Sequence, residues 1–110
     1  MANFESIILP SKPNVVAPDG MSVRILLQTE RGSMAHFQLD PQEVSTAIAH
    51  RTVEEIWYVL EGQGRVWRSP PAQESAAIKP APVGPGDALT IPTGWQFQFS
   101  AEDAAPLRFL

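Results

Sequence analysis

Apolar and polar positions along the chain follow short runs and period-two alternation. No stretch of ten or more residues repeats its apolar positions with a helical period. The clearest run covers residues 55–60, where Ile, Trp, Tyr and Val are typical of a strand. The same pattern predicts strands at 22–29, 34–39, 46–51, 55–60, 65–68, 76–83, 88–91, 96–100 and 107–110. Only residues 41–45 could form a single helical turn.

The faces of the first two strands follow from alternation. We expect Val23, Ile25 and Leu27 to share one face, and Ala35, Phe37 and Leu39 to form the more apolar face of the next strand. Pro80 and Pro82 cannot donate to a ladder, so residues 76–83 are expected at a sheet edge.

Turn residues separate these runs at 31–32, 40–41, 61–64, 84–87 and 92–94. Many short strands with turns between them predict an all-β sandwich or closed barrel. A length of 110 residues fits one domain, for which we expect residues 23–110, with 1–22 as an N-terminal arm or edge strand. The last strand pattern is still running at Leu110, so either the chain is a fragment or this strand is completed elsewhere.

Composition narrows the classes of partner. The net charge is −4, and no cluster of Lys and Arg marks a nucleic-acid footprint. The absence of cysteine excludes disulfides, thiolate ligands and a cysteine nucleophile, and it fits a cytoplasmic protein. No signal peptide and no apolar stretch of about 20 residues is present, so we expect no membrane partner.

Two stretches resemble the motifs of the cupin superfamily. In residues 50–62, His50, Glu55 and Gly62 have the spacing of the first motif, but Ile48 stands where its other histidine belongs. In residues 86–94, the second motif is matched by Gly86, Pro92 and Gly94. The histidine that normally follows is replaced by Phe97, or by Gln96 in the variant spacing.

This resemblance implies a double-stranded β-helix (jelly-roll) barrel whose metal is held by three histidines and a glutamate near one mouth. Here His50, Glu55 and Gln96 are the candidate ligands, with His36 as a further candidate. A divalent ion (Zn, Fe, Mn or Ni) is one expectation. The alternative is a site with no metal or a weakly held one, in which His50 and Glu55 form a hydrogen-bonded polar pair.

The pocket at the mouth is expected to be lined by Ile48, Trp57, Trp95 and Phe97, whereas Trp67 and Phe99 are expected in the core. If Glu55 points inward, Trp57 points inward too. Arg51 and Arg68 are either surface residues or partners for a substrate carboxylate.

Several functions remain open from the sequence. The first is binding of a small organic molecule at a degenerate metal site. The second is a metal-dependent enzyme, of dioxygenase, isomerase or lyase type, acting on a small polar substrate. The third is metal-free acid–base catalysis by Glu55 with His50. The fourth is a dimer-forming scaffold, and we expect a homodimer that uses the outward faces of Tyr58 and Leu60.

Overall fold

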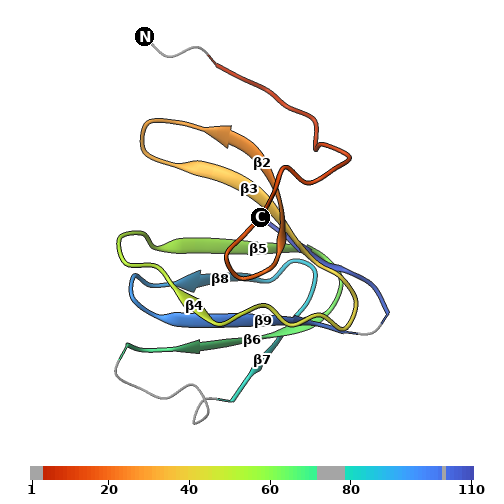
Figure 1. The fold of residues 1–110 in the computed structure, drawn as a ribbon, viewed down its shortest axis with the longest axis vertical. Coiled ribbons are helices and arrows are strands. Elements are labelled where there is room, and N and C mark those ends of the chain that lie inside the picture. Colours follow the sequence, from red (N-terminus) through yellow and green to blue (C-terminus); the bar gives the residue numbers. More distant parts are fainter. Residues whose placement is uncertain (1–3, 72–78, 103) are drawn as a thin grey trace.

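A computed structural model describes residues 4–71, 79–102 and 104–110 of the chain (Figure 1). Within these residues all regular structure is β-strand, in two antiparallel sheets. The strands are β1 (Val15–Val16), β2 (Ser22–Gln28), β3 (Ser33–Leu39), β4 (Ile48–Ala49), β5 (Glu55–Glu61), β6 (Gly64–Ser69), β7 (Ala81–Val83), β8 (Ala88–Ile91), β9 (Gln96–Ala101) and β10 (Leu107–Phe109). The described residues include no helix long and apolar enough to cross a membrane.

The two sheets form a jelly-roll barrel. The larger sheet has the order β1-β2-β3-β10-β5-β8, and the smaller has the order β4-β9-β6-β7. The last strand, β10, therefore lies in the middle of the larger sheet, between β3 and β5 (Figure 1). The predicted all-β barrel of double-stranded β-helix type is confirmed.

The largest differences from the predicted strands have local causes. A bulge between Ile25 and Leu27 shifts the β2–β3 register, so Leu27 does not share a face with Val23 and Ile25 as expected. The strand expected at 46–51 is reduced to the two residues of β4. Residues 41–45 contain a turn, with Gln42 at a φ of 70°, and no helical turn. Part of the edge strand expected at 76–83 lies outside the described residues; its described part, β7, pairs with β6 alone.

The core is a cluster of aromatic side chains from both sheets. Trp57 of β5 is 2% exposed, and its ring centroid lies 4.6 Å from those of both Phe37 and Phe109. Phe99 of β9 lies 5.2 Å from Trp57, and Phe97 lies 6.1 Å from it. Aromatic rings at these separations attract one another beyond their area burial. Trp57 therefore joins the two sheets, and the barrel interior is filled by side chains.

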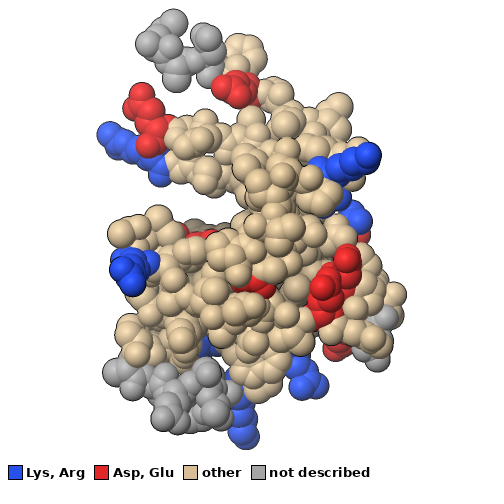
Figure 2. Space-filling view, viewed as in Figure 1, with Lys and Arg blue, Asp and Glu red and all other residues tan. Residues whose placement is uncertain are grey.

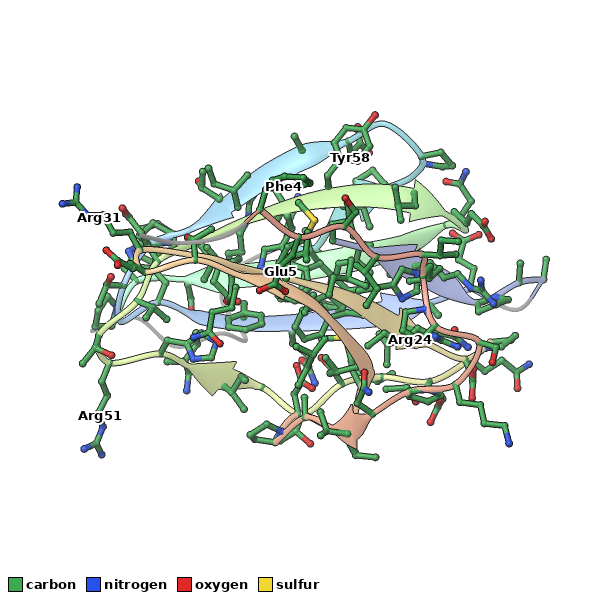
Figure 3. The ribbon with its side chains drawn as sticks, turned by 90° about the horizontal axis from the view of Figure 1, so that it is seen from above. Phe4, Glu5, Arg24, Arg31, Arg51 and Tyr58 are labelled. Carbon is green, nitrogen blue, oxygen red and sulfur yellow. The ribbon has the colours of Figure 1, made fainter. Side chains whose placement is uncertain are left out.

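A side chain of the larger sheet binds the main chain of residues 10 and 11. Arg24 of β2 is only 7% exposed; its Nε donates to the carbonyl of Pro10 at 2.8 Å, and its Nη2 donates to that of Ser11 at 3.2 Å. Figure 3 shows Arg24 beneath the N-terminal segment. Residues 4–9, here called the arm, precede this attachment and belong to no strand.

Gly62 provides a test of how the β5–β6 turn meets β10. Its φ is +84°, and a Cβ at this position would overlap the carbonyl oxygen of Pro106. We expect Gly62→Ala to lower the free energy of unfolding by about 3 kcal/mol, because strain and overlap add. Gly20 has a φ of +91° with open space around it, so Gly20→Ala should cost only about 1–2 kcal/mol. Urea denaturation measures both, and equal losses would contradict the close approach at Gly62.

Candidate functional site

Two polar side chains meet at the mouth of the barrel. His50 follows β4, and Glu55 begins β5, so the short connection between these strands brings both to one place. His50 Nε2 lies 3.1 Å from Glu55 Oε1, and the two side chains are 37% and 24% exposed. The His50 ring also packs against Phe97, at a centroid distance of 5.6 Å. The sequence prediction named both residues, and the structure brings them together.

The surroundings of Glu55 favour its neutral form. Burial raises the pKa of Glu55 above its ordinary value of 4.5, and the nearby carboxyl of Asp19 raises it further. His50 and the indole N–H of Trp57 act in the opposite direction, but burial outweighs them. Within the described residues, neither Trp57 Nε1 nor Glu55 Oε1 completes a hydrogen bond of good geometry, although both atoms are buried. The pair is therefore a polar group with unused hydrogen-bonding capacity.

Asp19 is a member of this neighbourhood that the sequence did not suggest. It is 3% exposed; burial raises its pKa, while the N–H of Met21 and the charge of His50 lower it. Asp19 comes near the site because its carbonyl accepts a hydrogen bond from the Thr46 N–H, 2.8 Å away, ahead of β4. In the sequence it stands in a Pro-Asp-Gly turn, which gives no hint of that long-range contact.

A cleft of about 430 Å³ opens beside Glu55, between the β2–β3 hairpin and β5. Its walls come from residues 31–35 and 53–57 together with Phe37 and Leu110. Figure 2 shows it as the notch on the left, below the part of the molecule formed by β2 and β3. The cleft combines a partly buried carboxyl with apolar and aromatic walls, which is the usual character of a ligand site.

The other candidate ligands lie away from this pair. On β9, Phe97 points into the barrel, so alternation places Gln96 on the outer face of the smaller sheet. His36 is buried on the outer face of β3, opposite Arg24 and away from the inward-facing Phe37. Neither residue is brought to His50 and Glu55.

The predicted pocket residues are divided between the cleft and the core. Trp57 lines the cleft, whereas Phe97 belongs to the core and borders a separate small cavity of about 10 Å³. Ile48 and Trp95 are partly buried and pack against the core. Phe99 is fully buried, as expected for a core residue, while Trp67 is half-buried on the smaller sheet.

The two candidate arginines do not enter the cleft. Arg51 is exposed and points away from the molecule in Figure 3. Arg68 is half-buried, and its Nη1 donates to the carbonyl of Thr90 at 3.1 Å. Arg31, at the β2–β3 turn, is the arginine that borders the cleft.

Comparison with known proteins agrees with the fold and the motifs. The model of the cupin domain family matches residues 35–110. The chain belongs to the cupin family. A search of curated proteins finds no match.

Solved cupin-fold structures resemble this cupin at low sequence identity. The CENP-C cupin domain of Drosophila melanogaster has a TM-score of 0.72 at 13% identity, over 84% of this chain and 68% of that chain. KdgF from Halomonas sp. has a TM-score of 0.69 at 21% identity, over 87% and 81%. A predicted oxalate decarboxylase from Thermotoga maritima has a TM-score of 0.70 at 19% identity, over 94% of both chains. At such identities these likenesses show the fold alone.

The donor set of this cupin does not fit the metal centre that the family implies. Within the described residues, no three His, Cys, Asp or Glu side chains form a group that could hold a metal ion. His50 and Glu55 contact each other directly, and the remaining inward positions nearby, Ile48 and Phe97, are apolar. Two donors are fewer than a stable site for Zn or Fe ordinarily has.

Restoring one histidine should strengthen metal binding. Ile48 and His50 face the same way, so Ile48→His adds an imidazole to the existing pair. We expect this variant to bind Ni²⁺ or Zn²⁺ at least tenfold more tightly than the wild type, measured by titration calorimetry. Ala49→His is the control, because Ala49 is exposed and faces the opposite way. An equal gain in that control would show that the added histidine does not act through His50 and Glu55.

The raised pKa of Glu55 predicts a pH-dependent stability. A carboxyl whose pKa is raised by folding stabilises the protein below its unfolded-state pKa, and this contribution is lost as pH rises through the folded value. The melting temperature of Glu55→Gln should therefore equal that of the wild type near pH 4 and exceed it by a few degrees at pH 8. Thermal melts across this range measure the difference, with exposed Glu54→Gln as control. A difference in melting temperature that stays constant with pH would contradict a raised pKa of Glu55.

Proposed function

We propose that this cupin binds a small organic molecule in the cleft beside Glu55, without relying on a metal centre. The single observation that carries the proposal is the cleft itself, about 430 Å³ in volume and bordered by a partly buried carboxyl. Ligand sites in proteins commonly have volumes of about 300–1,000 Å³, mostly apolar walls and a few polar groups that fix orientation. A cytoplasmic location remains a prediction from the sequence.

The chemistry of the walls suggests what the ligand carries. Glu55 offers an acceptor 3.1 Å from His50 Nε2, and the apolar walls of Phe37, Val53 and Trp57 favour a hydrocarbon or aromatic portion. A ligand with an ammonium or other strong donor group would satisfy the carboxyl, and it would compensate for the cost of burying that charge. Small organic cations with an apolar part are thus the ligand class that this site favours.

A second candidate function is metal-free acid–base chemistry at the same residues. The observation that favours it is the raised pKa of Glu55 beside an imidazole 3.1 Å away. A carboxyl with such a pKa holds its proton closer to neutral pH than an ordinary glutamate does, as a general acid or base requires. Loss of turnover in Glu55→Gln, with ligand binding retained, would separate this function from binding alone.

The binding proposal is tested by a thermal-shift screen of small organic cations, followed by titration calorimetry of the compounds that stabilise the protein. Glu55→Gln should weaken binding of such a compound at least tenfold, because hydrogen bonds to a charged group contribute about 1.5–3 kcal/mol. Glu54→Gln is the matched control, since Glu54 also borders the cleft but is exposed; we expect less than a twofold effect. Equal effects of the two variants would contradict a specific role for Glu55.

A further inference from the structure

A row of polar side chains crosses the outer face of the larger sheet. The strand register brings its members together on four strands: Arg24 of β2, His36 and Gln38 of β3, Arg108 of β10 and Glu61 of β5. Phe37 and Phe109, which alternate with these residues on β3 and β10, pack in the core, so the row faces outward. Its members are not among the residues that line the cleft beside Glu55. We call these five residues the polar row.

Arg24 is a buried cation whose hydrogen-bond partners are neutral. It is 7% exposed. Its guanidinium donates to the carbonyls of Pro10 and Ser11, at 2.8 and 3.2 Å, and to the side-chain carbonyl of Gln38, at 3.3 Å. Among the described residues, Arg24 forms no ion pair with a carboxylate. Gln38 donates to the carboxylate of Asp40 at 2.9 Å, so that charge reaches Arg24 only through an intervening amide. Because burying an unpaired charge costs free energy, this environment favours an added anion.

Two nitrogen atoms of the polar row are buried and have no hydrogen-bond partner within the described part of the chain. They are Nδ1 of His36, a residue that is 1% exposed, and Nε of Arg108. Glu61 Oε2 lies 4.0 Å from Arg108 Nε, which is beyond hydrogen-bonding distance. Buried polar atoms in proteins nearly always have a partner, so these two atoms indicate an acceptor that the protein itself does not supply.

The two nitrogens lie close enough to share one acceptor group. Arg108 is directly opposite Gln38, and His36 is two residues before Gln38 on the same face of β3. His36 and Arg108 are therefore diagonal neighbours on adjacent strands, about 7–8 Å apart, which is within reach of a long side chain.

The electrostatic potential at His36 is positive. Burial lowers the pKa of His36 below its ordinary value of 6.5, and the charges of Arg24 and Arg108 lower it further. The charge of Glu61 raises this pKa, but by less than either arginine lowers it. His36 is therefore neutral at pH 7, and a neutral imidazole still has one N–H to donate. A negatively charged acceptor beside it would meet a favourable potential.

We propose that the polar row binds a small oxyanion, a phosphate or carboxylate group, between His36 and Arg108. Oxygens of the anion accept hydrogen bonds from His36 Nδ1 and Arg108 Nε, and the negative charge compensates for that of buried Arg24. A guanidinium suits both groups, because each presents two oxygens that match its N–H fork. The side chains of Arg108 and Glu61 are 32% and 67% exposed, so they can turn outward and admit the anion. This site is separate from the cleft and does not depend on the function proposed there.

Proton NMR with phosphate and acetate as probes tests the site at His36 itself. Each anion is added at pH 7, and chloride keeps the ionic strength constant. The chain has two histidines, so His50→Gln assigns the two imidazole signals. We expect the His36 signal to shift saturably with phosphate, with acetate or with both, and the anion that acts identifies the group. No saturable shift with either anion, or an equal shift of the His50 signal, would overturn the proposal.

Two substitutions should change the affinity for the responding anion in opposite directions. Arg108→Gln should weaken binding at least tenfold, because it removes a charge-assisted hydrogen bond. Glu61→Gln should strengthen binding at least twofold, because it removes a negative charge that competes for Arg108. Both residues are partly or largely exposed, and thermal melts in chloride verify that the variants are folded.

Matched controls make the same changes of charge elsewhere on the surface. Arg65→Gln lies on β6 of the other sheet, and Glu30→Gln lies between β2 and β3; both residues are exposed. Each control should leave the affinity within twofold of the wild type. A loss in Arg108→Gln no larger than in Arg65→Gln, or a gain in Glu61→Gln no larger than in Glu30→Gln, would show a response to net charge alone and would overturn the site.

Discussion

The packing of Trp57 against aromatic residues of both sheets is the contact on which the rest of this structure depends. Its ring meets Phe37 and Phe109 within its own sheet and Phe99 on the opposite one. Small barrels are either filled by side chains or hollow enough for a ligand. In the described part of this cupin the aromatic cluster fills the interior, and the cleft proposed as a ligand site lies at the rim, beside Glu55.

The same packing accounts for the chemistry of the site. Phe97 stands where the family resemblance expects a histidine, and it is 2% exposed within the core. Replacing it by a ligand would remove buried aromatic contacts, so metal binding and core stability make opposite demands at this position. Glu55 lies beside His50, whose ring packs against Phe97, and burial is the largest influence on the pKa of Glu55. The packing of Phe97 in the core thus leaves the family's metal site without one of its histidines, and the same apolar core lies next to the Glu55–His50 pair.

Much of the fold and part of the site could be predicted from the sequence. Alternation placed Trp57 inward, and the short connection between β4 and β5 brought His50 to Glu55. The same rule, applied to β9, places Gln96 and Phe97 on opposite faces, so the two cannot both point into the barrel. Other features depend on contacts between distant segments: the approach of Asp19 through Thr46 and the bulge after Ile25. Local patterns carry no information on these.

Arg24 holds the N-terminal segment through the carbonyl oxygens of Pro10 and Ser11, and both contacts are to the main chain. Every residue type presents such an oxygen, so the attachment is indifferent to which side chains occupy positions 10 and 11. The guanidinium, by contrast, has no substitute, because lysine lacks the planar fork that reaches two acceptors at once. Across homologous chains we therefore expect positions 10 and 11 to vary in sequence while the backbone there keeps its course, and we expect position 24 to remain arginine.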